Sequence, residues 1–276
     1  SILLTSTGLL RASSMPAIST TATTVNTSPT FSPLKKILTG KEIAQKVEKA
    51  TGKLEAWLVL DNGQRIREGI GTASLMDETG RVITAFHLVD AIDKTTWTIK
   101  EDGKDVEVKI DRVEFVFYLP IKNQQYNAKV IGINRSSDYA TLKVEIPRED
   151  YEPLDIGDST QVSKGEDVWI AGFPYKFPNV LLRKGTISDI NLLQDRFDDY
   201  VYSYVVTDKH TGPGNSGGPV LNEKGEIVAI IIGPKPNIGV SYAAPLHTAC
   251  VNVLKEKNVE IPDIGLETPV NNFPRS

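Results

Sequence analysis

Residues 212–219 read Gly-Pro-Gly-Asn-Ser-Gly-Gly-Pro. At average frequencies of about 7% for glycine and about 5% for proline, the three glycines and the proline of the last six positions would coincide about twice in 100,000 positions. A glycine-rich turn between strands would explain some of them. A serine nucleophile explains more, because Gly214 and Ser216 could point their backbone N–H groups at one oxyanion. Gly217 and Gly218 would then keep Cβ atoms away from the approach to the serine.

A serine hydroxyl is a weak nucleophile unless a base takes its proton and another group orients that base. The sequence offers three histidines, at positions 87, 210 and 247. His87 follows the predicted strand at residues 82–86, which rises from the turn at Gly80, so a rigid element would hold its ring. His247 falls on a predicted helix, where a solvated or half-buried histidine is ordinary. We therefore predict that His87 is the base.

Asp138 is the best candidate for the group that orients the histidine. Residues 136–138 read Ser-Ser-Asp and close a turn, after which residues 139–144 begin an alternating strand. A plain turn aspartate is the other interpretation of Asp138. Asp90 and Asp93 compete for the role, but they lie three and six residues after His87 and are expected to cap the helical turn that follows it.

Most of the chain is patterned as short strands. Turn residues at 61–63, 78–80, 101–103 and 222–225 separate many of them. The predicted strands span residues 54–60, 71–76, 82–86, 113–119, 128–133, 141–146, 167–171, 181–190, 200–207, 219–221, 227–232 and 240–244. Twelve strands with almost no helix between them predict an all-β fold, an antiparallel barrel or sandwich.

Two helices are expected at the ends of this β-rich region. Residues 39–42 read Thr-Gly-Lys-Glu, which is the spacing of a capping box, and a short apolar stripe follows, with the helix closed at Gly52. Residues 246–257 predict a C-terminal helix in which Cys250 lies on the apolar face as a core residue. Residues 1–38 are predicted to be a disordered tail, because positions 1–33 hold 15 Ser or Thr and no acidic residue.

Composition excludes several classes of chemistry. The net charge is −4 and no stretch is densely basic, so nucleic acid is not an expected partner. The single cysteine excludes an intrachain disulfide framework and, with three histidines, a cysteine-rich zinc cluster, so neither a metal nor another cofactor is predicted. Residues 2–10 are too short and too polar to span a membrane.

In their chain order, His87, Asp138 and Ser216 resemble the triad of the chymotrypsin superfamily. The surrounding sequence is similar to the HtrA/Deg branch over about residues 40–258. The stretches that carry this likeness are residues 71–74 (Gly-Thr-Ala-Ser), 127–132 (Asn-Ala-Lys-Val-Ile-Gly), 156–159 (Ile-Gly-Asp-Ser), 168–174 (Val-Trp-Ile-Ala-Gly-Phe-Pro), 185–188 (Gly-Thr-Ile-Ser) and 207–208 (Thr-Asp).

The resemblance implies a chymotrypsin-like fold of two perpendicular six-stranded antiparallel β-barrels, with the active site in the cleft between them. Within a protease domain at residues 39–258, barrel one would span about 54–150 and barrel two about 151–245, leaving residues 259–276 as an extension. Only 18 residues follow position 258, so no PDZ domain is expected there, and the oligomeric state stays open.

The implied function is a serine endopeptidase that cleaves polypeptides through an acyl-enzyme, with Gly214 and Ser216 as the oxyanion hole. Ile231, Ile232 and Gly233 resemble the strand that pairs with the substrate backbone. By family position, His210 lies near the floor of the specificity pocket with Lys209 beside it, and a cationic floor would favour an acidic residue before the scissile bond. A Lys–His pair on a surface loop is the ordinary alternative. Phe86 departs from the pattern, because the family usually has a small residue before the histidine, so access to the cleft could differ.

Two alternatives share parts of this pattern. A protease-fold protein could bind peptides or partners without cleaving them, since a fold alone never establishes activity. An acyl hydrolase acting on esters would share the triad, but it normally shows Gly-x-Ser-x-Gly and the chain order Ser, Asp, His. The order here is the reverse, so the endopeptidase is favoured. The usual location of the family that this sequence resembles, together with the composition of the tail, favours an extracytoplasmic or organellar location.

Overall fold

The computed structural model describes residues 35–135, 137–194, 200–207, 212–235 and 239–246. Its one α-helix within them is α1 (Gly40–Ala50). The strands are β1 (Thr51–Leu60), β2 (Arg65–Leu75), β3 (Arg81–Ala85), β4 (Thr96–Glu101), β5 (Lys104–Leu119), β6 (Gln124–Asn134), β7 (Tyr139–Val144), β8 (Asp167–Gly172), β9 (Leu181–Gln194), β10 (Tyr200–Thr207), β11 (Pro219–Leu221), β12 (Ile227–Lys235) and β13 (Val240–Pro245). Short 3₁₀ helices are η1 (Phe86–Leu88), η2 (Asp90–Asp93), η3 (Pro120–Lys122), η4 (Arg148–Asp150), η5 (Ser159–Gln161) and η6 (Pro174–Lys176).

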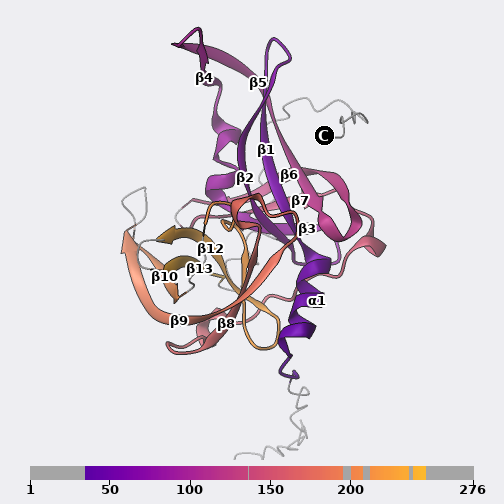
Figure 1. The fold of residues 1–276 in the computed structure, drawn as a ribbon, viewed down its shortest axis with the longest axis vertical. Coiled ribbons are helices and arrows are strands. Elements are labelled where there is room, and N and C mark those ends of the chain that lie inside the picture. Colours follow the sequence, from indigo (N-terminus) through magenta and orange to yellow (C-terminus); the bar gives the residue numbers. More distant parts are fainter. Residues whose placement is uncertain (1–34, 136, 195–199, 208–211, 236–238, 247–276) are drawn as a thin grey trace, which may run out of the picture. The chain divides into compact units, whose positions relative to one another are not determined.

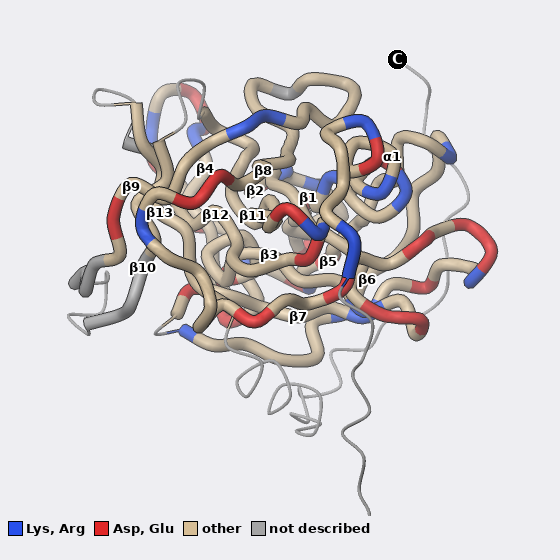
Figure 2. Tube along the Cα trace, turned by 90° about the horizontal axis from the view of Figure 1, so that it is seen from below, with Lys and Arg blue, Asp and Glu red and all other residues tan. Residues whose placement is uncertain are grey.

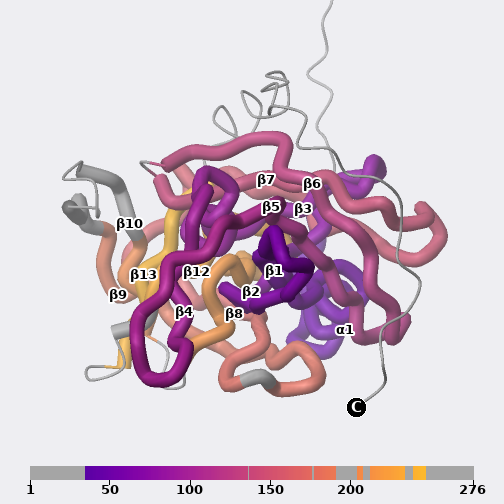
Figure 3. Tube along the Cα trace, turned by 90° about the horizontal axis from the view of Figure 1, so that it is seen from above, coloured from indigo at the N-terminus to yellow at the C-terminus, as the bar shows by residue number. Residues whose placement is uncertain are grey.

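The strands form two closed antiparallel barrels of six strands each. In the first, the order is β1-β2-β3-β7-β6-β5, and pairing between β1 and β5 closes the ring. In the second, the order is β10-β13-β12-β11-β8-β9. In Figure 1 the second barrel lies to the lower left of the first, and Figure 3 shows the same division from above, with β9, β10 and β13 on one side and α1 on the other. The predicted two-barrel, chymotrypsin-like fold is confirmed.

Each of the twelve predicted strands is present, although several are longer than predicted. One strand was missed, β4, which pairs with the first half of β5 as a hairpin. The turn at residues 101–103 was predicted, and its two central residues, Asp102 and Gly103, have φ of 51° and 78°. Two consecutive positive φ angles are the signature of a tight hairpin turn that matches the twist of paired strands. Figure 1 shows this hairpin projecting beside the β1–β2 turn.

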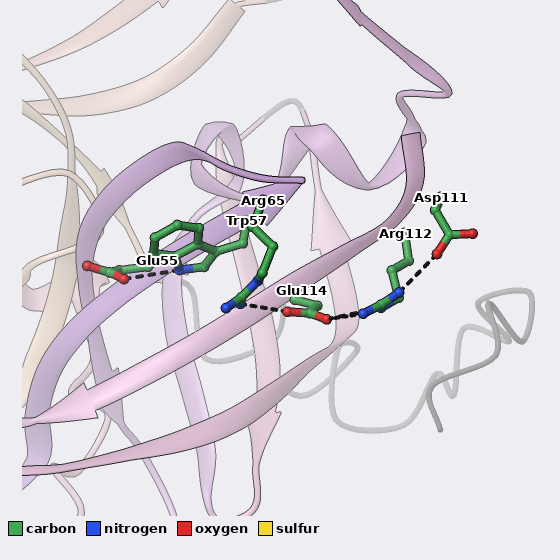
Figure 4. Close-up of polar contacts among 6 residues, drawn as sticks. All are labelled: Glu55, Trp57, Arg65, Asp111, Arg112 and Glu114. Carbon is green, nitrogen blue, oxygen red and sulfur yellow. Dashed lines mark hydrogen bonds and ion pairs between the residues drawn. The ribbon is translucent and has the colours of Figure 1, made fainter. Parts of the chain in front are cut away.

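The outer face of β1, β2 and β5 carries a network of charged side chains around Trp57 (Figure 4). The guanidinium of Arg65 lies 4.9 Å from the centre of the Trp57 ring and donates to Glu114 over 2.7 Å. Arg112 also donates to Glu114, and the Trp57 indole N–H donates to Glu55 over 3.1 Å. Because these groups are half-exposed, we expect each ion pair to add at most about 1 kcal/mol to stability.

The capping box of α1 is present as predicted. The Thr39 hydroxyl accepts from the Glu42 N–H over 3.3 Å, and the Glu42 carboxylate accepts from the Thr39 N–H over 2.8 Å. The pKa of Glu42 is lowered to about 2, first by its hydrogen bond from Lys36 and then by those from Thr39. The helix ends at Ala50, so the predicted end at Gly52 was wrong, because Thr51 and Gly52 already pair in β1.

Replacing Thr39 with alanine should destabilise the protein by about 1 kcal/mol, because the first turn of α1 would lose its side-chain cap. Thr39→Ser keeps the hydroxyl and is the matched control. Chemical unfolding of the three proteins measures the difference. A Thr39→Ala variant as stable as the wild type would show that the cap contributes nothing here.

Basic residues are not concentrated in one part of the described chain, as expected from a sequence without a densely basic stretch. Figure 2 shows Lys and Arg interspersed with Asp and Glu along the strands and loops. Within the described part of the chain, no helix is long and apolar enough to cross a membrane. Of the predicted C-terminal helix, residues 247–257, with His247 and Cys250, lie outside the described residues. Its first residue, Leu246, is described and is not helical.

Candidate active site

His87 lies in the short helical turn η1, directly after β3. The predicted strand at residues 82–86 ends one residue early, at Ala85. Pairing of Ala85 with Tyr139 brings the end of β3 beside the start of β7, where Asp138 precedes the strand. The Phe86 side chain is fully buried in the core, and its N–H donates to the Asp138 carbonyl over 3.0 Å. The Phe86 ring is therefore part of the core, and the Arg135 guanidinium lies 4.7 Å from its centre.

Both carboxylate oxygens of Asp138 bind His87. Oδ2 lies 2.8 Å from the ring Nδ1, and Oδ1 accepts from the backbone N–H of His87 over 2.9 Å. Asp138 has φ of 50°, a left-handed conformation that aspartate and asparagine tolerate better than most residues. An ionised carboxylate can only accept, so it holds the proton on Nδ1 and leaves Nε2 with its lone pair. His87 is thus oriented as a proton acceptor.

The two competing aspartates make other contacts. Asp90 lies 3.6 Å from Lys94, and Asp93 pairs with Arg135. The expectation that they cap the turn after His87 was wrong, because the residue at the N-cap of η2 is Val89 and no side chain caps it.

Ser216 lies in the second of two successive β-turns. In the first, the Asn215 N–H donates to the Gly212 carbonyl over 3.2 Å, and in the second the Gly218 N–H donates to the Asn215 carbonyl over 2.8 Å. Gly214 and Gly217 each occupy the third position of a turn, with φ of 100° and 79°. A positive φ at that position defines a type II turn and requires glycine there in most sequences.

The N–H groups of Gly214 and Ser216 have no hydrogen-bond acceptor among the described residues. The Pro213 carbonyl accepts from the Tyr175 N–H over 2.8 Å, and the Asn215 carbonyl accepts from Gly218. In a trans peptide the N–H points opposite to the carbonyl that precedes it, so each contact turns the following N–H outward. Among the described residues, neither N–H donates to another protein atom. Both donors are therefore available to an oxyanion.

Thr72 of β2 ties this turn to the first barrel. Its N–H donates to the Ser216 carbonyl over 2.8 Å, and its buried hydroxyl donates to the Gly214 carbonyl over 2.7 Å. A Cβ on Gly217 would lie 2.1 Å from the Thr72 carbonyl oxygen, and one on Gly218 would lie 2.2 Å from that of Ala171. The two glycines thus make room for neighbouring backbone, a structural role that the sequence did not suggest.

Gly71 shows how near the serine turn lies to the histidine. A Cβ on Gly71 would lie 2.9 Å from the Ser216 carbonyl oxygen and 2.2 Å from the side chain of Leu88, the residue after His87. The backbone of Ser216 and the turn that holds His87 therefore pack against the same point of β2. The junction of the two barrels thus places the backbone of Ser216 near the helical turn that contains His87.

Strand β12 runs beside the serine turn. The Ile231 carbonyl accepts from the Gly217 N–H over 2.7 Å, and its N–H donates to the Gly218 carbonyl over 2.8 Å. Between Ile231 and Gly233 the pairing with β13 shifts register, so Ile232 falls in a bulge. A Cβ on Gly233 would have no neighbour within 4 Å. His210 lies outside the described residues.

No group of three or more His, Cys, Asp or Glu side chains that could hold a metal occurs among the residues that the structure describes.

Two antiparallel barrels with a His–Asp pair on one and a serine turn on the other define a chymotrypsin-like protein. Residues 71–230, more than half of the chain, match the trypsin-like peptidase domain, and the chain belongs to that family.

Its relatives include HtrA/Deg proteases. The serine protease HhoB of Synechocystis is 28% identical over 205 residues, which cover 72% of this chain and 44% of that protein. Protease Do-like 8, chloroplastic, of Arabidopsis thaliana is 28% identical over 220 residues, 75% of this chain and 46% of that protein. The chain thus spans less than half the length of these two relatives. A solved HtrA-type protease with a tripeptide shares the fold, with a TM-score of 0.59 and 18% identity over 79% of this chain and 63% of that one.

Proposed function

We propose that the protein is a serine endopeptidase in which Ser216 is the nucleophile, His87 the general base and Asp138 the group that orients it. The observation that carries the proposal is the double contact of the Asp138 carboxylate with the ring and the N–H of His87. A histidine held at Nδ1 by a half-buried carboxylate can act as the base that a serine hydroxyl needs in order to react.

In this mechanism, Ser216 Oγ attacks the scissile carbonyl carbon while His87 Nε2 takes the hydroxyl proton. The N–H groups of Gly214 and Ser216 would stabilise the oxyanion, each worth about 3 kcal/mol in related sites. His87 then gives the proton to the departing amine, which leaves an acyl-enzyme on Ser216. Water hydrolyses the ester by the same route, with His87 again as base and then as acid.

Polypeptide substrates would lie along the backbone of Ile231, Ile232 and Gly233. The N–H of Ile231 already donates to Gly218, so at that residue a substrate N–H would bind the second lone pair of the carbonyl. Two observations support this part of the proposal: this segment of β12 lies beside the serine turn, and a Cβ on Gly233 would have no neighbour within 4 Å. Main-chain pairing binds extended peptides with little dependence on their side chains. Sequence position alone adds His210 as a pocket residue that favours an acidic side chain before the scissile bond.

The names of several relatives place them in chloroplasts or in the periplasm, for example a DegP-like periplasmic serine endoprotease of Chlamydia trachomatis. On that basis the proposed location of this protein is extracytoplasmic or organellar.

A fluorophosphonate probe tests the proposal without knowledge of the substrate, because it reacts only with an activated serine. We expect labelling of the folded wild type, but not of Ser216→Ala or of a heat-unfolded sample. A wild type that is folded and unlabelled would contradict the proposal and favour a protease fold that only binds peptides or partners.

A further inference from the structure

Strand β2 has an open backbone edge beside the serine turn. The Thr72 N–H points away from β1, because it donates to the Ser216 carbonyl over 2.8 Å. Alternate residues of a strand turn their backbone groups to the same edge, so the N–H and carbonyl of Ile70 also point away from β1. Within the described part of the chain, neither of these two groups has a hydrogen-bond partner. An extended peptide would find a pairing position there.

The open edge lies where the second half of a substrate would leave the site. If the acyl half lies along β12, the other half continues past Ser216 toward β2. On an antiparallel path, two residues back along β2, from Thr72 to Ile70, correspond to two residues forward along the substrate. The second residue after the scissile bond would then pair with Ile70. Antiparallel partners share a face of the sheet, so its side chain would lie on the outer face of β1 and β2.

Lys53 brings a positive charge to that face. It lies on β1 opposite Thr72, and its Nζ is 5.4 Å from the centre of the Phe173 ring and 5.7 Å from that of Tyr118. The Phe173 backbone contacts the serine turn, since a Cβ on Gly214 would lie 2.2 Å from the Phe173 carbonyl oxygen. Among the described residues, no carboxylate pairs with the Lys53 ammonium.

The neighbouring charges are already paired. Glu55, which lies opposite Ile70, accepts from Arg67 over 3.2 Å and from the Trp57 indole over 3.1 Å. The other cations around Trp57 bind carboxylates in the network of Figure 4. Partial burial has the largest effect on the pKa of Lys53 and lowers it, because a half-buried ammonium is poorly hydrated. A carboxylate brought by a substrate would compensate for that lost hydration.

We infer that Lys53 is a specificity-determining residue that selects an acidic side chain at the second position after the scissile bond. This inference rests on the proposed function and names a class of substrate for it. It concerns the half of the substrate that leaves as the amine, whereas the proposal for His210 concerns the residue before the scissile bond.

The cleavage products of unfolded casein test the inference first. Mass spectrometry of the products gives the residues found at each position around the cleaved bonds. We expect Asp and Glu to be enriched about threefold at the second position after the bond, as a half-exposed ion pair allows. They should not be enriched at the first or third position, because alternate side chains of an extended peptide point to the other face.

Variants of Lys53 test the role of its charge on peptides that copy one cleaved sequence. With Glu in place of Gln at the second position, the wild-type kcat/KM should be about fivefold higher. Lys53→Arg should keep this preference, and Lys53→Met should reduce the ratio to about 1. Lys53→Glu should reverse it, so that a peptide with Lys at that position is cleaved faster than the Glu peptide. A reversal cannot come from partial unfolding, which lowers both rates equally.

Lys129→Met is the matched control, because Lys129 is an exposed lysine on β6 of the same barrel. Its Glu-to-Gln ratio should equal that of the wild type. A wild type that cleaves casein without the enrichment, or a Lys53→Glu variant that keeps the wild-type preference, would overturn the inference and leave the proposed function standing. Equal losses of preference in Lys129→Met and Lys53→Met would also overturn it, since net charge would then be the cause. A folded wild type that cleaves neither casein nor the peptides and is not labelled by the fluorophosphonate would overturn both.

Discussion

Replacing Ser216 with alanine is expected to lower turnover of a polypeptide substrate by about 10⁶-fold, while the temperature of unfolding changes by no more than about 2 °C. The large factor follows from the proposed mechanism, in which Ser216 Oγ is the only atom that forms the acyl-enzyme. The fold should tolerate the change because the contact between Ser216 and β2 uses the serine carbonyl, which alanine keeps. Alanine also keeps the N–H that is proposed for the oxyanion hole.

Hydrolysis of an unfolded protein substrate measures the first expectation, and calorimetry measures the second. Ser188→Ala is the matched control, because Ser188 is a half-buried serine on β9 that bonds to Thr207 and has no place in the mechanism. It should retain wild-type turnover. A folded Ser216→Ala protein that still cleaves the substrate at the wild-type rate would remove Ser216 from the mechanism.

The fold could be predicted from the sequence because its strands are short, apolar and separated by turn residues. The strand that was missed shows the limit of that reasoning. In β4 and the first half of β5, charged and polar residues alternate with Trp97, Ile99, Val106 and Val108, which are only half-buried. A hairpin that projects from a barrel buries too little surface to leave a strong apolar pattern, although its turn at Asp102 and Gly103 was recognisable.

Only part of the candidate site could likewise be predicted from the sequence. His87, Asp138 and Ser216 could be proposed from the sequence because their side chains carry the chemistry. The contacts of Thr72 and Tyr175 with the serine turn could not, because they are made by a buried hydroxyl and a backbone N–H whose acceptors are brought near only by the fold. No spacing in the sequence marks either residue.

The Asp138→Asn variant is expected to lower turnover by about 10⁴-fold with little loss of stability. Asparagine has nearly the same shape and tolerates the left-handed φ of 50° at this position, whereas alanine would be strained there. Its carbonyl oxygen can still accept from the His87 N–H, which leaves the amide NH₂ facing the ring Nδ1. Because an NH₂ group can only donate, Nδ1 must become the acceptor, and the proton moves to Nε2. The nitrogen that should take the serine proton is then already protonated.

Asp93→Asn is the matched control for this prediction, because it removes the same charge from a paired aspartate only six residues after His87. Its turnover should stay near that of the wild type. If Asp93→Asn lost as much activity as Asp138→Asn, the loss would reflect the local net charge. A loss of turnover in Asp138→Asn alone, in a protein that unfolds at the wild-type temperature, would show that activity depends on which nitrogen of His87 carries the proton. The two aspartates differ in one respect that matters here, since Asp138 alone of the pair is bonded to the imidazole among the described residues.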